Sequence, residues 1–245
     1  MILRPALAPD DDHLVCALST RLGGVSVGSF GMNLSFAVGD DPAAVMENRR
    51  RFFAAAGVSP DRVVFQKQVH GDTVLRVDAP GIVEATDGIC TATPDLYLCV
   101  TVADCVPIFL YDPGARAVGV VHAGWRGTVA GIVKRGVETM VRELGAQAAR
   151  MRAYIGPSAG VCCYVVGDEV SSRLPLSCVV ETPRGRAADL KCANQGLLEE
   201  AGIPPASITV DPACTICGSD LYHSHRREGA ASGRMMGLIG LRSVG

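Results

Sequence analysis

Residues 96–144 read LYLCVTVADCVPIFLYDPGARAVGVVHAGWRGTVAGIVKRGVETMVREL, and this stretch decides the fold. It begins with three short apolar runs, at residues 96–102, 107–111 and 117–121, that are rich in β-branched side chains and separated by turns. Such runs are typical of strands. Residues 128–144 follow, and their apolar side chains recur three and four positions apart, which predicts an amphipathic helix. Strands followed by a long helix indicate a domain in which helices cover a sheet.

The same patterns continue on both sides of this stretch. Further strands are predicted at residues 63–69, 74–77, 151–155 and 235–241. One helix is predicted to begin at Pro42 after a capping Asp41 and to end at Gly57, and another to span 189–201. Because strands and helices are interspersed without strict β-α-β alternation, we expect an α/β or α+β sandwich with mixed sheets. A length of 245 residues fits one domain over 1–245.

The composition excludes several classes of protein. The formal net charge is only -2 and no basic run is present, so we expect no nucleic-acid partner. Asp10, Asp11 and Asp12 interrupt the segment where a signal peptide would be most apolar, and no run of about 20 apolar residues exists to span a membrane. We therefore expect a cytoplasmic protein.

Ten cysteines are spread through the chain. In a reducing compartment such residues are mostly buried thiols, metal ligands or nucleophiles, so we expect these in preference to disulfides. Cys162-Cys163 and the CxxC pair Cys214 and Cys217 lack two further ligands at metal spacing, and we expect them to be buried thiols.

Three short segments each contain a histidine or cysteine that can ligate a metal. They are QKQVHGD at 66–72, VADCVP at 102–107 and VHAGWRG at 121–127, and each lies at the end of a predicted strand. Rigid scaffolds present catalytic groups at such positions. Two imidazoles and one thiolate suit zinc, and copper also accepts them, while three protein ligands leave a coordination position open as in catalytic zinc sites. The spacing of these residues along the chain does not decide whether they share one metal site or have three separate structural roles.

More motifs accompany these three segments. They are STRLGGVS at 19–26, MNL at 32–34, VGDDP at 38–42, DG at 87–88, IGPS at 155–158, CCYVVG at 162–167 and SHRREG at 224–229. In this order, over nearly the whole chain, they resemble the motifs of the multicopper polyphenol oxidase or laccase-domain family, also called YfiH-like. The resemblance implies that His70, Cys105 and His122 bind zinc, with copper as the alternative. It also implies a fold like that of cysteine hydrolases of the cytotoxic-necrotizing-factor type.

Members of that family are described as purine nucleoside phosphorylases, so the resemblance implies purine nucleosides and phosphate as partners. The implied substrates are adenosine, inosine, guanosine and S-methyl-5′-thioadenosine, and deamination of adenosine is implied as well. We expect Asp104 to support the metal ligands or to act as a base. Guanidinium groups match phosphate oxygens, and Asn33 can hydrogen-bond base or ribose. The expected phosphate-binding residues are Arg21, Arg126, Arg226 and Arg227.

Two other activities remain open at this point. One is a copper-dependent polyphenol oxidase. Blue-copper laccases use several His-x-His pairs, whereas this sequence has only His223-Ser224-His225, which argues against an oxidase. We expect these residues to form an exposed polar loop. The other is a Cys-His hydrolase that edits cell-wall precursors, in which Cys105 would be a nucleophile activated by a histidine. A non-enzymatic metal-binding protein would leave the glycine-rich loop and the arginines unexplained. The sequence permits a monomer or a homodimer.

Overall fold

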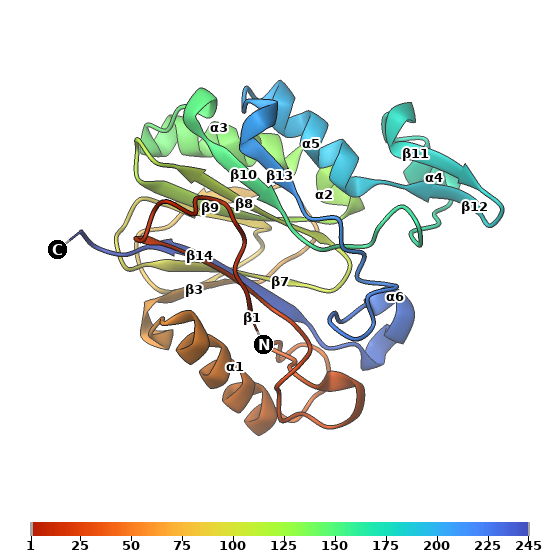
Figure 1. Ribbon diagram of the computed structural model, residues 1–245, viewed down its shortest axis with the longest axis horizontal. Helices are drawn as coiled ribbons and strands as arrows, with labels where there is room; N and C mark the ends of the chain where they lie inside the picture. The colour runs from red at the N-terminus through yellow and green to blue at the C-terminus, as the bar shows by residue number, and fades with distance from the viewer. Residues whose placement is uncertain (1, 245) are drawn as a thin grey trace.

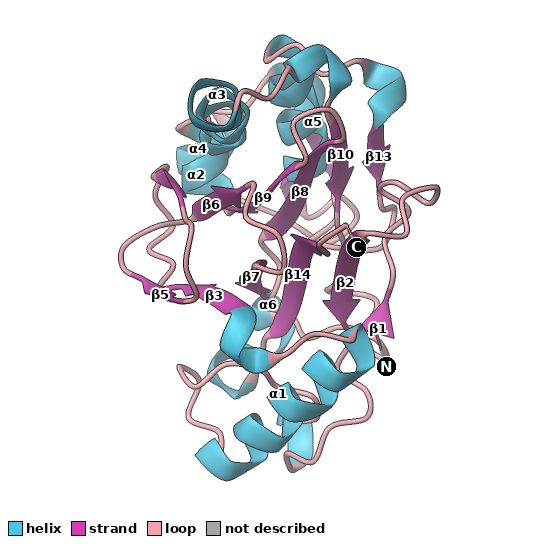
Figure 2. Cartoon of the chain, turned by 90° about the vertical axis from the view of Figure 1, so that its left-hand side faces the viewer, coloured by secondary structure: helices cyan, strands magenta, loops and turns pink. Residues whose placement is uncertain are grey.

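Two β-sheets lie face to face between helices in the computed structural model, which describes residues 2–244 (Figure 1). Helices α3 (Ile132–Leu144) and α5 (Leu190–Glu200) cover the outer face of one sheet, and α1 (Pro42–Ala56) covers the outer face of the other. Figure 2 shows the same four layers from the side. The predicted α/β sandwich with mixed sheets is therefore confirmed.

Both sheets mix parallel and antiparallel pairs. The first has the order β1 (Ile2–Leu3), β2 (Leu14–Ser19), β14 (Met235–Leu241), β7 (Tyr97–Val102), β3 (Val63–Gln66) and β5 (Gly81–Val83). The second has the order β13 (Ile208–Val210), β10 (Arg152–Ile155), β8 (Val106–Asp112), β9 (Ala117–Ala123), β6 (Gly88–Thr91) and β4 (Val74–Arg76). In the first, β14 runs antiparallel to β7 while β3 runs parallel to it. A hairpin of β11 (Val179–Thr182) and β12 (Gly185–Ala188) stands apart from both.

Strand β8 is buried on both faces. Ile108 and Leu110 pack with the residues beneath α3 and α5, whereas Phe109 and Tyr111 pack between the two sheets. A strand covered on both sides needs apolar residues at consecutive positions instead of an alternating pattern. This explains the unbroken apolar run at 106–111 and places the turn before it, at residues 103–105, on a rigid support.

The predicted helix at 128–144 is wrong at its start. The chain forms a short helix α2 (Trp125–Val129), breaks at Gly131, which adopts a left-handed conformation with φ 77°, and then begins α3. Glycine populates this conformation at no steric cost. The predicted cap of α1 is confirmed, since the Asp41 side chain accepts a hydrogen bond from the backbone N–H of Ala43 at 3.1 Å. Strand β2 was not predicted, and neither were β1, β5, β6, β11, β12 and β13.

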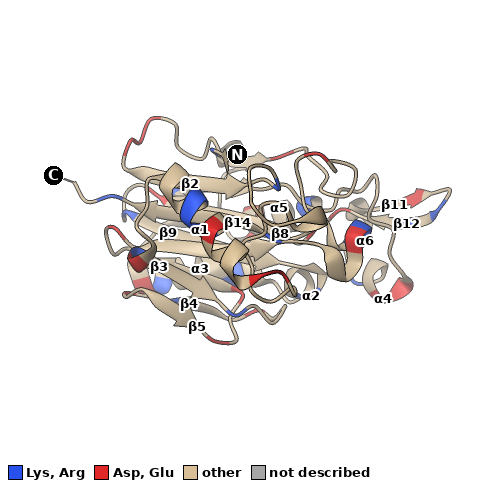
Figure 3. Ribbon diagram, turned by 90° about the horizontal axis from the view of Figure 1, so that it is seen from below, with Lys and Arg blue, Asp and Glu red and all other residues tan. Residues whose placement is uncertain are grey.

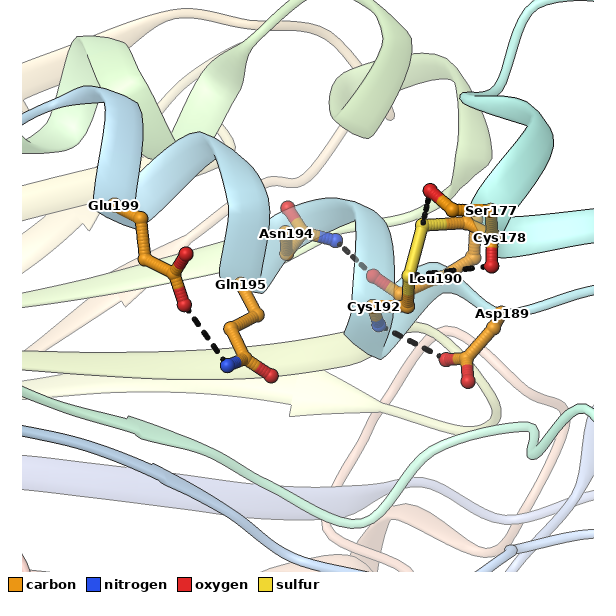
Figure 4. The surroundings of a disulfide bond; sticks show 8 residues. All are labelled: Ser177, Cys178, Asp189, Leu190, Cys192, Asn194, Gln195 and Glu199. Carbon is orange, nitrogen blue, oxygen red and sulfur yellow. Dashed lines mark hydrogen bonds between the residues drawn. A yellow bond between two sulfur atoms is a disulfide. The ribbon is translucent and has the colours of Figure 1, made fainter. Parts of the chain in front are cut away.

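Several expectations for cysteines and histidines are wrong. Cys178 and Cys192 form a disulfide that ties the chain before β11 to the first turn of α5, next to the capping carboxylate of Asp189 (Figure 4). Cys162 and Cys217 are exposed instead of buried. Of the other two cysteines in these pairs, Cys163 is half-buried and Cys214 is buried. The polar loop that contains the His-x-His pattern is only partly exposed, because His223 is fully buried while His225 lies at the surface.

Every helix within residues 2–244 is too short or too polar to cross a lipid bilayer. Basic and acidic residues are interspersed along the ribbon, as Figure 3 shows.

Candidate metal centre

The fold brings together His70, Cys105 and His122. Their ligand atoms all lie within 4.8 Å of one another, and the two imidazole rings meet edge to face with centroids 4.9 Å apart. His70 lies in the loop after β3, Cys105 in the turn between β7 and β8, and His122 within β9. The three ligands thus come from both sheets, at the edge where these strands end.

A buried carboxylate organises two of these ligands. Asp87, directly before β6, is fully buried and accepts a hydrogen bond from Nδ1 of His122 at 2.7 Å. It also accepts the backbone N–H groups of Val69, His70 and Gly71 at 3.0, 3.0 and 2.8 Å. Burial acts to raise the pKa of Asp87, but the hydrogen bonds from His122 and the backbone lower it overall. With Nδ1 held, Nε2 of His122 is the nitrogen left to bind a metal, as in many histidine metal sites.

Cys105 and His122 are electrostatically coupled. Burial acts to raise the pKa of Cys105, but the charge of His122 and hydrogen bonds from both histidines lower it to about 6. Burial acts to lower the pKa of His122, whereas the charge of Cys105 and the Asp87 hydrogen bond raise it to about 9. Without a metal the pair is therefore a thiolate and an imidazolium near neutral pH, and the thiolate is the form that ligates metals.

Gly124 leaves room for these ligands. A Cβ at this position would lie 3.0 Å from Sγ of Cys105 and 3.2 Å from Cδ2 of His70, closer than ordinary van der Waals contact. The backbone of His70 adopts φ 60°, uncommon for a residue other than glycine, and the three N–H bonds to Asp87 hold this loop in place. Gly124 therefore allows the side chains of His70 and Cys105 to approach one another.

The three ligands lie in a cavity of about 780 Å³. Its wall includes Arg126, Arg226 and Arg234, together with the aromatic rings of Trp125 and Tyr164. The guanidinium of Arg126 lies 4.4 Å from the Trp125 ring centroid, and that of Arg226 lies 5.1 Å from the Tyr164 ring centroid. Cavities of this size, with a few convergent polar groups, are typical of small-molecule sites.

A family model described as multi-copper polyphenol oxidoreductase laccase matches residues 15–242. This chain belongs to that family. Curated relatives in the laccase family include purine nucleoside phosphorylases of Deinococcus radiodurans, 42% identical over 92% of this chain and 88% of the relative, and of Mycobacterium tuberculosis, 42% identical over 90% and 89%. The resemblance inferred from the motifs is confirmed.

Solved structures of laccase-family proteins have the same fold. YlmD from Geobacillus stearothermophilus is 37% identical, covers 96% of this chain and 94% of its own, and superposes with a TM-score of 0.91. YfiH from Bacillus licheniformis is 36% identical, covers 94% and 93%, and superposes with a TM-score of 0.89.

Three residues predicted to contact substrate lie outside the residues that line the cavity of this laccase-family protein. Arg21 forms an ion pair with Glu228 at 2.8 Å and bonds two backbone carbonyls. Asn33 is fully buried and its amide is satisfied by Asp40 and by nearby backbone groups. Arg227 bonds the carbonyls of three residues, at 215, 216 and 222. These side chains hold loops together.

Asp104 lines the cavity next to Cys105, but both of its carboxylate oxygens are occupied. Oδ1 accepts the hydroxyl of Thr215 and Oδ2 accepts the backbone N–H of Arg226, each at 2.6 Å. The second bond is at the start of the short helix α6 (His225–Glu228). Asp104 therefore positions the segment that carries Arg226.

Arg234, Tyr164 and Gln66 are among the residues of the cavity wall that sequence reasoning missed. Arg234 follows the last laccase-family motif and was not singled out, and Tyr164 lies inside CCYVVG without having been assigned a role. Gln66 donates its amide to the carbonyl of Cys99 at 2.9 Å, while its Oε1 is buried without a hydrogen-bond partner in the described part of the chain. The one sequence signal for Gln66 was its place at the start of the QKQVHGD segment, which contains His70.

Proposed function

We propose that this protein is a zinc-dependent purine nucleoside phosphorylase that acts on adenosine, inosine, guanosine and S-methyl-5′-thioadenosine. The observation that supports this most directly is that one cavity contains both the His70, Cys105 and His122 group and three arginines. The relatives named purine nucleoside phosphorylase support the same reaction. The proposal treats residues 1–245 as one domain that works in the cytoplasm, as a monomer or a homodimer.

The donor set fits zinc. Two imidazole nitrogens and a thiolate within 4.8 Å, with one histidine oriented by a buried carboxylate, match the ligand chemistry and outer-shell support of catalytic zinc sites. His70, Cys105 and His122 would hold the ion. When bound, zinc supplies a Lewis acid that polarises an oxygen or nitrogen of the substrate.

Phosphate recognition falls to the arginines of the cavity wall. Within residues 2–244, Arg126, Arg226 and Arg234 form no ion pair with a carboxylate. Arg234 is partly buried, and this burial lowers its pKa overall, although the charges of Cys105 and Asp104 act to raise it. Guanidinium groups bind phosphate oxygens through paired hydrogen bonds. We therefore assign phosphate to these residues in place of Arg21 and Arg227.

The nucleoside would occupy the remainder of the cavity. Trp125 and Tyr164 line the cavity and offer ring faces to the purine. In the reaction a phosphate oxygen bonds to C1′ as the bond from C1′ to N9 breaks, and the purine leaves with the electron pair and takes up a proton. Burial and the charge of Cys105 raise the pKa of Tyr164, so its hydroxyl keeps a proton that it can donate.

Adenosine deamination belongs to the proposal as a second reaction of the same cavity, because three protein ligands leave a coordination position open for water. The thiolate and imidazolium pair of Cys105 and His122 also favours a second candidate, the Cys-His hydrolase. The copper oxidase has less support, because neither His223, which is buried, nor His225, which lines the cavity, belongs to the group formed by His70, Cys105 and His122.

The test is release of hypoxanthine and ribose 1-phosphate from inosine by zinc-loaded protein. Phosphorolysis requires added phosphate and stops on chelation, whereas a Cys-His hydrolase would survive chelation and be blocked by iodoacetamide. Conversion of adenosine to inosine in phosphate-free buffer measures deamination, and oxygen uptake with a phenol and added copper measures oxidase activity. An absence of phosphate-dependent base release from all four nucleosides would refute the proposal.

A paired substitution tests the phosphate assignment. Arg126→Met should raise the KM for phosphate, whereas Arg50→Met, at an exposed arginine that pairs with Glu47 on α1, should leave it unchanged. An unchanged KM in the first variant would remove Arg126 from the phosphate site.

A further inference from the structure

Four cysteines converge outside the cavity. The Sγ atoms of Cys162, Cys163, Cys214 and Cys217 all lie within 4.8 Å of one another. The first pair lies in the loop after β10, and the second pair lies in the loop after β13. Cys162 and Cys217 are 55 residues apart in the chain, so two distant segments contribute two thiols each to one cluster.

The sulfur positions suit a bound metal better than a disulfide. Sγ of Cys162 and Sγ of Cys217 are 3.9 Å apart, whereas a disulfide requires about 2.05 Å. Tetrahedral zinc with bonds of about 2.3 Å to sulfur places neighbouring sulfurs about 3.8 Å apart. None of the four is in a disulfide, although Cys178 and Cys192 in the same chain are.

The backbone around the cluster is arranged for thiolates. The N–H of Gly160 donates to Sγ of Cys214 at 3.2 Å, and the N–H groups of Ile216 and Cys217 also hydrogen-bond to that sulfur. A Cβ at residue 160 would lie 2.9 Å from Cβ of Cys214 and 3.4 Å from Sγ of Cys162. Gly160 therefore permits the close approach of the two loops, and the donated N–H groups support a charged sulfur as they do around metal-bound ligands.

We propose that Cys162, Cys163, Cys214 and Cys217 bind a second zinc ion in a structural tetrathiolate site. Four protein ligands fill a tetrahedral coordination shell and leave no position for substrate, which distinguishes this site from the three-ligand centre in the cavity. Soft thiolate ligands select zinc over magnesium or calcium. The proposal is independent of the phosphorolysis reaction.

The site would fix one wall of the cavity. Tyr164 follows Cys163 directly, and Thr215 follows Cys214 and donates its hydroxyl to Asp104, which in turn holds the N–H of Arg226. The two clasped loops thus lead to both Tyr164 and Arg226 on the wall. Loss of the ion should loosen these two side chains while leaving His70, Cys105 and His122 in place.

Metal analysis of the full chain tests the proposal. After expression with zinc and removal of loosely bound metal, the wild type should contain two zinc ions per chain. Cys162→Ser/Cys217→Ser should contain one, and so should His122→Ala, which removes only the centre in the cavity. Unchanged zinc content in a folded Cys162→Ser/Cys217→Ser variant would overturn the proposal, as would iron in place of zinc.

A second measurement avoids any change to the cluster. His122→Ala is loaded with Co²⁺, and its absorption spectrum should show intense thiolate-to-cobalt charge transfer with the d–d bands of tetrahedral cobalt. The absence of these bands would overturn the proposal. Cys217→His, which keeps a zinc-binding side chain, should retain both ions.

Discussion

Replacing Asp87 with asparagine removes the acceptor on which the metal centre depends. Oδ1 accepts the N–H of His70 and Nδ1 of His122, and Oδ2 accepts the N–H groups of Val69 and Gly71. Asparagine has one oxygen and one NH₂ group, so in either orientation two of these donors, in bonds that are part-buried or, for His122, buried, face another donor. Each unpaired donor costs about 1–3 kcal/mol, which gives a loss of about 2–6 kcal/mol in the free energy of unfolding.

The same substitution should weaken zinc binding by about 10- to 100-fold, because it releases the loop that carries His70 and the orientation of His122. Zinc affinity is measured by competition with a chromophoric chelator, and stability by urea denaturation in EDTA so that metal does not contribute. Asp72→Asn is the matched control, since Asp72 is in the same loop and, among residues 2–244, its side chain forms only an exposed ion pair with Arg135 at 2.9 Å. Exposed pairs contribute about 0–1 kcal/mol. Wild-type zinc affinity in Asp87→Asn would refute the organising role of this carboxylate.

Three other predictions concern the same region and the buried histidine. Gly124→Ala should weaken zinc binding by about tenfold or more, because the added Cβ would contact Cys105. Gly196→Ala is the control, since a Cβ there meets nothing within 4 Å, and it should leave the zinc affinity unchanged. Equal zinc affinities in the two variants would contradict the role of Gly124. In chelated protein, alkylation of Cys105 followed by peptide mapping should rise with pH through about 6, and zinc should suppress it; a midpoint above pH 8 would contradict the ion pair. Burial, together with the charge of Arg21, lowers the pKa of His223 from 6.5 to about 4. As the pH falls below 6.5, His223 is therefore protonated in the unfolded state before it is protonated in the folded state. The free energy of unfolding should fall accordingly, by about 3 kcal/mol at pH 4. Urea denaturation should show a shallower pH dependence for His223→Gln, and an identical slope in both proteins would count against it.

The sequence was sufficient where the signal is local. The strand that ends near His122 and the apolar run of β8 follow from side-chain patterns, and His70, Cys105 and His122 were singled out because each lies at a strand end. The break at Gly131 was missed because glycine is tolerated within many helices, so its left-handed conformation does not follow from the sequence pattern.

Long-range pairing explains the rest. The convergence of Cys162 and Cys163 with the CxxC pair depends on how the loops after β10 and β13 meet, and those strands pair in parallel although they are far apart in the chain. The four hydrogen bonds of Asp87 likewise join segments that no periodicity connects. Arg21 and Arg227 were predicted by residue type alone, which cannot distinguish a ligand-binding arginine from one that bonds backbone carbonyls.

The origin of the three ligands from both sheets has a consequence for assembly. His70 follows β3 of one sheet, His122 belongs to β9 of the other, and Cys105 lies where the chain crosses between them. A metal ion held by all three can form its full set of bonds only after the sheets have docked, so its binding energy is added to the docked state. A bound ion would therefore link the two sheets, and the resistance of the sheets to separating during unfolding should depend on the concentration of available metal.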